Sequence, residues 1–321
     1  MSREAKLKEF IINRDIDLVG IAAASALDNE PEGHRPQDIL PGAKSIVVFA
    51  RSFADGAIQA AFRNFEDKNT PAQSSYAAYA SDLAPNFLLI NDTNEIALHI
   101  EDTYGEVAVP LPFHVQQSMT WDHYPAPLFA DPYGQGMPLN VFQAAMAAGL
   151  GEYGWSHRFV TEEYGPRVLV SAVLTTLELV PDAPYAGPAL CNPEECGICV
   201  KLCPTHAIKA PGEGCTCLSV EGKSVEAAEF NPNACAVASM AMRKEFKGRI
   251  PVPDLIMNDD PTDEELEAAF EKKPINGLSV DHFPRYFCDR CLLYCPLGNW
   301  KERFFETGFT TFDPDAEKAG A

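Results

Sequence analysis

Two short cysteine-rich runs constrain this chain more than any other feature of its sequence. Residues 191–204 read CNPEECGICVKLCP, with the spacing C-x4-C-x2-C-x3-C-P, and residues 288–296 read CDRCLLYCP, with the spacing C-x2-C-x3-C-P. In proteins with two cubane iron–sulfur clusters, a run of this kind supplies three thiolates to one cluster and lends its fourth, followed by proline, to the other. The runs therefore predict a fold that brings both segments together around iron and sulfide.

Two other uses of clustered cysteines fit the sequence less well. A disulfide framework is typical of short secreted chains, whereas this chain has 321 residues and opens with MSREAKLKEF, which has neither a twin-arginine motif nor an apolar signal segment. Structural zinc is usually held by paired C-x2-C knuckles, and a third thiol followed by Cys-Pro departs from that pattern. We therefore expect two 4Fe–4S clusters, electron-transfer chemistry and a cytoplasmic location.

The charge of the chain argues against nucleic acid as a partner. With 25 Lys and Arg against 46 Asp and Glu, the formal net charge is −21. Nucleic-acid binding depends on basic side chains that neutralise phosphates, and no run of them occurs here. A general acidity that keeps the protein soluble is the simpler explanation of the charge. No apolar stretch has the length of a membrane span, so we expect no membrane partner.

Hydrophobic periodicity and turn signals predict a mixed α/β chain. The expected elements are an N-terminal amphipathic helix leading into a strand at 18–23, a strand at 45–50, a helix at 86–104 ending at Gly105, a short helix capped by Gly149, a strand at 166–179, a hairpin turning at 221–223, a helix from 233 to 247 and an acidic helix starting at Thr262 or Asp263. A Pro/Ala loop before Cys191 places a domain boundary near residue 183.

Several segments, taken in order, resemble the superfamily of epoxyqueuosine reductases and reductive dehalogenases, which are cobalamin-dependent iron–sulfur enzymes. The segments lie between Asp17 and Trp300 and are DLVGIA, LPGAKSIVVFA, LFADPYGQG, AAGLGEYGWSHRFVTEEYGPRVLVSAVLTTLEL, CPTHAI, NPNAC and FCDRCLLYCP. The resemblance implies a nitroreductase-like α/β (α+β) core that binds base-off cobalamin, at residues 1–183. It implies that residues 184–321 form a ferredoxin-like module with two 4Fe–4S clusters.

The resemblance also implies how the thiolates are shared. Cys191, Cys196 and Cys199 are expected to bind one cluster together with Cys295. The other cluster is expected to be bound by Cys203, Cys235, Cys288 and Cys291, where Cys235 matches a lone cysteine of the family and supplies the ligand that the second run lacks. Cys215 and Cys217 remain as ordinary hairpin side chains, although either could replace Cys235 if Cys235 proves remote.

The segment from Gly149 to Ser156 matches the corrinoid-contacting loop of the family. The residues expected to contact the cofactor are Gly149, Leu150, Gly151, Tyr153, Gly154 and Ser156. Glycine suits this role because the backbone must approach a flat macrocycle closely. The same glycines also fit a helix cap followed by a tight turn, so the pattern has two interpretations.

Asp131 in LFADP matches the proton-donor position of the epoxyqueuosine enzymes. Its aromatic and apolar neighbours would raise its pKa by desolvation, as a general acid near neutral pH requires. The alternative is an Asp-Pro turn. Tyr76 and Tyr79 fall where the family carries an active-site tyrosine, with core packing as the alternative. Three further candidates, of second rank, are His114, His123 and Tyr124.

These expectations favour an enzyme that reduces a small-molecule substrate in the manner of a reductive dehalogenase, with electrons from an external low-potential donor such as a ferredoxin or flavodoxin. Epoxyqueuosine reduction on tRNA is a second hypothesis, which the acidic charge argues against. A non-catalytic ferredoxin-like carrier is a third, which leaves the large N-terminal part unexplained. Flavin is an alternative cofactor, because the fold family has flavin-binding relatives.

Overall fold

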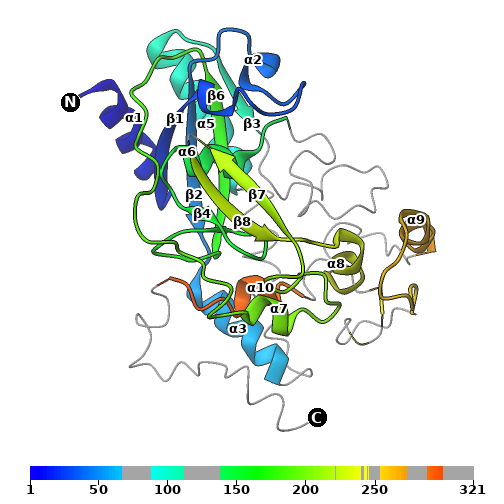
Figure 1. Cartoon of the computed structure of the whole chain (residues 1–321). Helices are drawn as coiled ribbons and strands as arrows, with labels where there is room; N and C mark the ends of the chain where they lie inside the picture. Colours follow the sequence, from blue (N-terminus) through cyan, green and yellow to red (C-terminus); the bar gives the residue numbers. More distant parts are fainter. Residues whose placement is uncertain are drawn as a thin grey trace, which may run out of the picture.

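The computed structural model describes residues 1–66, 88–111, 138–220, 222–239, 242–243, 245, 254–272 and 288–298. Its centre is a four-stranded sheet with the strand order β1-β2-β6-β3 (Figure 1). These strands are β1 (Leu18–Ala23), β2 (Ser45–Ser52), β6 (Val168–Thr175) and β3 (Ala108–Leu111). All three pairings are antiparallel, and the register places Ala23 opposite Ser45 and Ser45 opposite Thr175. The fold is therefore a mixed α/β structure built on an antiparallel sheet.

Both faces of this sheet are buried, which explains why its strands are continuous apolar runs in the sequence. Every residue of β6 is buried, and so are the first six residues of β2. Antiparallel strands that have one wet face alternate apolar and polar residues, whereas strands covered on both sides do not. The side chains of β2 alternate between two separate hydrophobic clusters, with Val47 and Phe49 in one and Ile46 and Val48 in the other.

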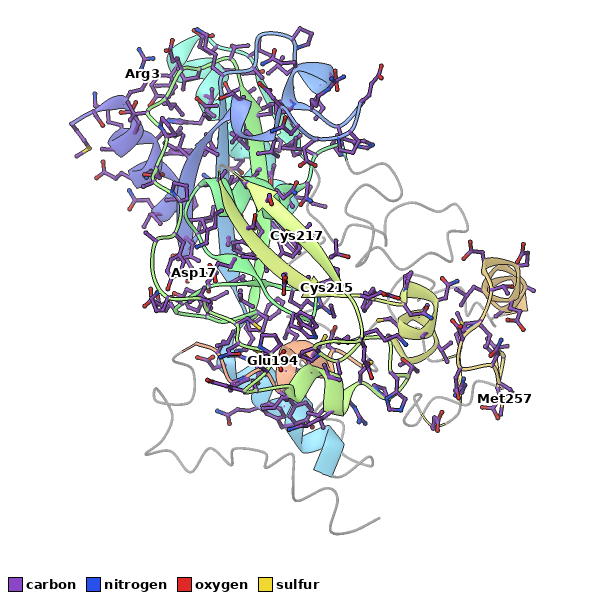
Figure 2. The ribbon with its side chains drawn as sticks, viewed as in Figure 1. Arg3, Asp17, Glu194, Cys215, Cys217 and Met257 are labelled. Carbon is purple, nitrogen blue, oxygen red and sulfur yellow. The ribbon has the colours of Figure 1, made fainter. Side chains whose placement is uncertain are left out.

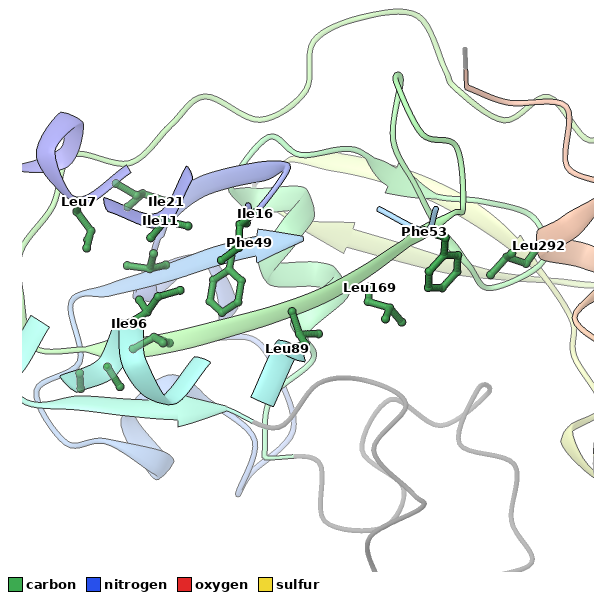
Figure 3. Close-up of a cluster of buried hydrophobic side chains, with 14 of the residues drawn as sticks. Leu7, Ile11, Ile16, Ile21, Phe49, Phe53, Leu89, Ile96, Leu169 and Leu292 are labelled. Atoms are coloured by element: carbon green, nitrogen blue, oxygen red, sulfur yellow. The ribbon is translucent and has the colours of Figure 1, made fainter. Parts of the chain in front are cut away.

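Helices cover one face of the sheet (Figure 3). Helix α1 (Arg3–Ile12) contributes Leu7 and Ile11, and helix α5 (Ile90–Tyr104) contributes Ile96 and Ile100, all fully buried. Helix α3 (Asp55–Glu66) and helix α10 (Arg290–Leu293) join the same cluster at its lower end. The second cysteine run, which contains α10, is thus attached to the core of the sheet.

The other face is covered by helix α6 (Val141–Ala147) and by the hairpin of β7 (Cys215–Val220) and β8 (Lys223–Ala228) (Figure 1). Helix α6 is small-residue rich and all seven of its residues are buried. From the hairpin, Val220 is buried in this cluster, and Leu218 and Val225 pack against it. The first and second halves of the sequence therefore share one core. The predicted division at residue 183 stays a prediction.

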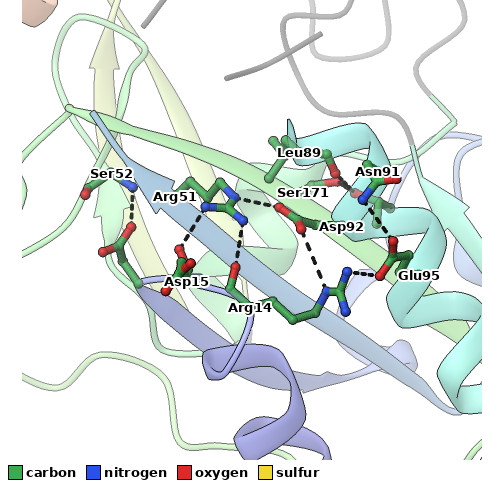
Figure 4. A network of polar contacts seen from close by, with 11 residues as sticks. Arg14, Asp15, Arg51, Ser52, Leu89, Asn91, Asp92, Glu95 and Ser171 are labelled. Atoms are coloured by element: carbon green, nitrogen blue, oxygen red, sulfur yellow. Dashed lines mark hydrogen bonds and ion pairs between the residues drawn. The ribbon is translucent and has the colours of Figure 1, made fainter. Parts of the chain in front are cut away.

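A buried polar network ties the N-terminal helix to the sheet (Figure 4). Arg51 Nε donates to Asp92 Oδ2 over 2.5 Å, and its two other guanidinium nitrogens donate to the carbonyl oxygens of Arg14 and Asp15. Arg14 also forms ion pairs with Asp92 and with Glu95. Asp92 is only 4 % exposed. A buried carboxylate is stable only when its charge is paired, and Arg14 and Arg51 provide that pairing.

The remaining described elements are helices α2 (Pro36–Ile39), α7 (Ile198–Leu202), α8 (Pro232–Ser239) and α9 (Asp263–Lys272), the 3₁₀ turn η1 (Ala24–Leu27), and the short hairpin of β4 (Glu152–Tyr153) and β5 (Phe159–Val160). Of these, helix α2 lies at the upper end of the molecule in Figure 1 and helix α7 at the lower end. Helix α9 begins with a capping box in which Thr262 and Glu265 each accept a hydrogen bond from the other's backbone N–H. None of the described helices has the length and apolar composition of a membrane span.

The structure confirms most of the predicted elements and shortens two of them. The strands at 18–23 and 45–50, the hairpin at 221–223 and the start of α9 are confirmed. The predicted strand 166–179 is too long, because the chain turns after Thr175, whose hydroxyl accepts from the N–H of Leu177. Of the predicted helix 233–247, the structure shows α8 up to Ser239, and the described residues 242, 243 and 245 are not α-helical. The carbonyl of Met242 accepts from the N–H of Leu255, and the other residues of 240–247 lie outside the described residues.

Two glycines hold the second cysteine run against the turn between β5 and β6. A Cβ added to Gly165 would lie 2.3 Å from the carbonyl oxygen of Leu297, and Gly165 has a φ of +58°. On the other side, a Cβ added to Gly298 would lie 2.7 Å from the backbone nitrogen of Gly165. This close approach of two backbones leaves no room for a side chain.

We expect Gly165→Ala to destabilise the protein by about 3 kcal/mol, from about 1–2 kcal/mol of left-handed backbone strain and a similar overpacking term. In melting temperature this is about 6 °C. Gly212→Ala is the matched control, because Gly212 has a φ of +86° with no atom within 4 Å of the added Cβ. The control should therefore lose only the backbone strain. Equal melting temperatures of the two variants would contradict the proposed close approach.

Candidate iron–sulfur centre

Helices α7 and α10 bring the two cysteine runs together (Figure 1). Cys199 lies within α7 and Cys291 within α10, and the two helices pack against one another. Both helices begin with a residue in the left-handed conformation, namely Gly197 with φ +58° and Asp289 with φ +45°. The left-handed residue before each helix turns the chain sharply, so that cysteines before and within the helix can lie on the same side.

The thiols form two groups, each drawn from both runs. Of the neighbouring thiols, Cys291 acts most strongly on Cys199, followed by Cys191, Cys295 and Cys196. Around Cys235 lie Cys288, Cys291 and Cys203. We call these the first quartet (Cys191, Cys196, Cys199, Cys295) and the second quartet (Cys203, Cys235, Cys288, Cys291). The sequence predicts these two groups, and both the grouping and the binding of clusters stay predictions.

Burial raises the pKa of several of these thiols. It raises the pKa of Cys288 and of Cys295 to about 12, and it raises the pKa of Cys235 strongly. The neighbouring thiolates raise the pKa of Cys235 further. Four buried negative charges repel one another unless a positive centre lies between them. Iron would provide that centre, and binding would displace the thiol protons.

Backbone N–H groups point at two of the sulfurs. The N–H of Trp155 donates to Cys191 Sγ over 3.4 Å, and the N–H of Ala207 donates to Cys203 Sγ over 3.2 Å. Hydrogen bonds to sulfur stabilise the thiolate form and are one of the factors that set cluster potentials. The donor set of each quartet therefore fits a 4Fe–4S cluster. Among the described residues, no group of three or more His, Cys, Asp or Glu side chains has the arrangement for a single metal ion.

A cavity of about 240 Å³ opens beside the first quartet. Its walls include four thiols of the centre, those of Cys191, Cys196, Cys199 and Cys295, together with Cys291. The wall on the sheet side comes from Gly154, Trp155 and Ser156 in the β4–β5 hairpin. Part of the segment that the sequence assigns to corrinoid contact therefore lies against the first quartet.

The other glycines of that segment pack against the chain itself. A Cβ on Gly149 would lie 2.3 Å from the carbonyl oxygen of Ala183, and one on Gly151 would lie 2.1 Å from that of Val160. Tyr153 is buried, and its hydroxyl donates to Asn140 Oδ1 over 3.1 Å. Leu150 is partly buried against the α6 side of the sheet. Close packing thus accounts for these residues, and their contact with a corrinoid stays a prediction.

A buried carboxylate joins the hairpin to the first cysteine run. Glu152 is 4 % exposed, and its Oε2 accepts from the N–H of Leu190, the residue before Cys191. Its Oε1 forms an ion pair of 2.6 Å with Lys223, in the turn of the β7–β8 hairpin. Glu152 therefore fixes the start of the cysteine run on β4, a role that its sequence context does not indicate.

Two arginines, one buried and one partly buried, also reach the second cysteine run from the segment before it. Arg167, 2 % exposed, donates to the carbonyl oxygens of Cys295 at 2.9 Å and Leu292 at 3.3 Å, and to that of Leu297. Arg158 pairs with Asp289 over 2.8 Å and hydrogen-bonds to Cys291. The sequence analysis missed both, and the only available signal was two isolated cations near the glycine-rich segment.

Cys215 and Cys217 lie apart from both quartets. They are exposed on β7, on the outer side of the hairpin in Figure 2. The pairing of β7 with β8 places them opposite Ala228 and Glu226. Because Cys235 lies within the second quartet, neither hairpin thiol is needed to replace it.

The remaining predicted site residues cannot be placed in this arrangement. Asp131, Tyr76 and Tyr79, with His114, His123 and Tyr124, lie outside the described residues. Their roles stay predictions.

Glu30 is a titratable group near the corrinoid-predicted segment that the sequence analysis did not single out. Burial raises its pKa from 4.5 to about 7, although a hydrogen bond with Gln143 opposes this change. Glu30 also lies near enough to Tyr153 to raise the pKa of that phenol, which burial raises much more. A carboxyl group that titrates near neutral pH beside this segment is a candidate proton donor.

The raised pKa of Glu30 gives a pH-dependent stability. The folded protein holds this proton between pH 4.5 and about pH 7, so stability is lost as pH rises through that window and the penalty is complete above it. The full cost would be about 3 kcal/mol, which partial exposure reduces to about 1 kcal/mol. We expect Glu30→Gln to be more stable than the wild type by about 1 kcal/mol at pH 8 and by much less at pH 4.5.

Urea denaturation at both pH values measures this difference in the free energy of unfolding. Glu32→Gln is the control, because Glu32 is exposed two residues away. A gain of equal size at both pH values, or in both variants, would contradict the assignment to Glu30.

Comparison with known proteins gives distant matches. No protein-family model matches the chain. The epoxyqueuosine reductase of Gloeobacter violaceus is 27% identical over 216 residues, which cover 60% of this chain and 57% of that protein. The tetrachloroethene reductive dehalogenase of Dehalobacter restrictus is 38% identical over 82 residues, which cover 25% of this chain and 14% of that protein. The chain thus spans about half of the first relative and a small part of the second.

Among solved structures, an epoxyqueuosine reductase with a modified tRNA-Tyr stem loop is similar. It has 16% sequence identity and a TM-score of 0.47, and the match covers 95% of this chain and 75% of that chain. In sequence, the chain is thus distantly similar both to epoxyqueuosine reductases and to reductive dehalogenases.

Proposed function

We propose that the chain is a cobalamin-dependent iron–sulfur reductase of the superfamily of epoxyqueuosine reductases and reductive dehalogenases, to whose members it is distantly similar in sequence. The observation that carries this proposal is the pair of cysteine quartets, each assembled from both runs, next to the hairpin predicted to contact the corrinoid. An electron carrier alone would need the quartets only. The shared core with the large N-terminal part favours an enzyme over a carrier.

The residues present fit two 4Fe–4S clusters. The first quartet would bind one and the second quartet the other, and when bound the clusters would carry single electrons. The buried side chains of Trp155 and Ile208 pack next to the cysteines and limit their contact with water. The N–H groups of Trp155 and Ala207 hold two of the sulfurs, those of Cys191 and Cys203.

The proposal that cobalamin binds rests on similarity to the superfamily and not on a cavity seen among the described residues. Gly154 and Ser156 line the space beside the first quartet and are available for contact. Gly149 and Gly151 are already packed against backbone carbonyls. If cobalamin binds, it would supply the reducing metal centre, and the protein would supply orientation and a proton.

The proposed substrate is a small molecule, with a low-potential ferredoxin or flavodoxin as electron donor. The formal net charge of −21 opposes the approach of tRNA, whose binding depends on basic side chains. The epoxyqueuosine reductase match keeps tRNA as the second candidate. A salt-resistant complex with a tRNA anticodon stem loop would return that candidate to first place.

Anaerobic reconstitution tests the proposal. We expect about eight irons per chain, from two cubanes, and a further change in the visible spectrum when cobalamin is added. Electron paramagnetic resonance should show base-off cobalamin without nitrogen splitting from an imidazole. With reduced methyl viologen as donor, tetrachloroethene is a first probe, and chloride release reports turnover. Clusters that form without any binding of cobalamin would favour the carrier hypothesis.

A further inference from the structure

One guanidinium beside the second quartet comes from outside the cysteine runs. Arg158, in the β4–β5 hairpin, hydrogen-bonds to Cys291 and acts electrostatically on Cys235. On its other side, Arg158 Nη2 forms an ion pair of 2.8 Å with Asp289 Oδ1, and each side chain is only 16% exposed. The positive charge is therefore held between a carboxylate and a thiol of the centre.

This placement is not explained by stability alone. An ion pair taken out of water gains little net free energy, because desolvation offsets most of the attraction. Asp289 has φ +45°, a left-handed conformation that Asp and Asn adopt more readily than most residues other than glycine. The cost of the arrangement is therefore the desolvation of the two charges, which indicates a role for the charges themselves.

We propose that Arg158 raises the reduction potential of the cluster bound by the second quartet, and that Asp289 limits this increase. The inference rests on the proposed function, since it needs the cluster to be bound. Reduction adds one electron, and thus one negative charge, to the cluster. A fixed cation beside it stabilises the reduced form, and an N–H···S hydrogen bond acts in the same direction.

Arg167 differs from Arg158 in what it contacts. Its guanidinium donates to the carbonyl oxygens of Leu292, Cys295 and Leu297, so it anchors the backbone of the second run. Arg158 instead donates to a thiol and to one carboxylate. Arg158 is therefore a positioning and tuning residue for the cluster, and Arg167 is an anchor.

Redox titration of the reconstituted protein, monitored by electron paramagnetic resonance, tests this role. Arg158→Gln should lower the midpoint potential of one cluster by about 59 mV or more, which is a tenfold change in the ratio of reduced to oxidised cluster. Asp289→Asn should raise the same potential, because it removes the opposing charge, and asparagine tolerates the left-handed conformation. Arg158→Lys, which keeps the positive charge, should lower the midpoint potential less than Arg158→Gln does.

The opposite shifts in midpoint potential expected for Arg158→Gln and Asp289→Asn distinguish an effect of charge from a merely structural effect. A merely structural role would make Arg158→Gln and Asp289→Asn change cluster content in the same direction, and it would move no potential upward. The control is Arg35→Gln, because Arg35 forms an ion pair of the same 2.8 Å length with Asp38 at the opposite end of the molecule (Figure 1). This control should leave both potentials unchanged.

The outcomes also separate this inference from the proposed function. A wild-type protein that assembles no clusters would overturn the proposed function and this inference with it. Two clusters whose potentials are the same in the wild type and in Arg158→Gln would overturn this inference alone. Should Arg158→Gln not assemble clusters, a potential in Asp289→Asn equal to or below that of the wild type would overturn it as well.

Discussion

Replacing Cys203 by serine is expected to remove the cluster of the second quartet and to leave that of the first intact. Cys203 follows Cys199 closely in the sequence, but it ends α7 in an extended conformation, with φ −68° and ψ 110°. Its thiol therefore leaves the direction of the helix and lies near Cys235 and Cys288. We expect iron to fall from about eight to about four per chain.

Double variants make this test independent of which signal belongs to which cluster. Cys203→Ser with Cys235→Ser should lose no more iron than either alone, because both thiols serve one cluster. Cys203→Ser with Cys196→Ser should lose nearly all iron. Cys215→Ser is the control, because Cys215 is exposed on β7. The interleaved assignment would be overturned if the iron losses of the single variants added up in Cys203→Ser with Cys235→Ser but not in Cys203→Ser with Cys196→Ser.

The sequence predicted the sheet and the hairpin well because their signals are local. The apolar runs at 18–23 and 45–50 need no information beyond their own residues and match β1 and β2 closely. The strand order β1-β2-β6-β3 depends on pairing between distant segments, which no local pattern encodes. Helices α7 and α10 span five and four residues, too few for a hydrophobic period to show.

The candidate site divides in the same way. Ligand spacing is a local property, so the two runs by themselves indicate iron–sulfur clusters, whereas the assignment of Cys235 rests on the family resemblance and stays a prediction. Arg158, Glu152 and Glu30 could not, since each is an ordinary charged residue until the fold buries it next to another group. The glycines at 149 and 151 keep the two interpretations that the sequence allows, because packing against the chain accounts for them and their contact with a corrinoid stays a prediction.

Replacing Asp131 by asparagine is expected to slow the chemical step while cobalamin and both clusters stay bound. Asp131 lies outside the described residues, so this prediction rests on the match of LFADP to the proton-donor position of the superfamily. Loss of one positioned acid typically lowers a rate by about 10²–10⁴-fold. The wild-type rate should also fall as pH rises, because the protonated acid is the donor, and the variant should lose this dependence.

Glu30→Gln is the matched comparison for that experiment. Glu30 is a carboxyl group with a pKa of about 7 near Tyr153, and so it competes with Asp131 for the role of proton donor. Single-turnover rates of both variants, with a probe that the wild type reduces, decide between them. If Asp131→Asn reacts at the wild-type rate and Glu30→Gln is slow, Glu30 is the donor. If both react at the wild-type rate, Tyr76 or Tyr79 takes the role.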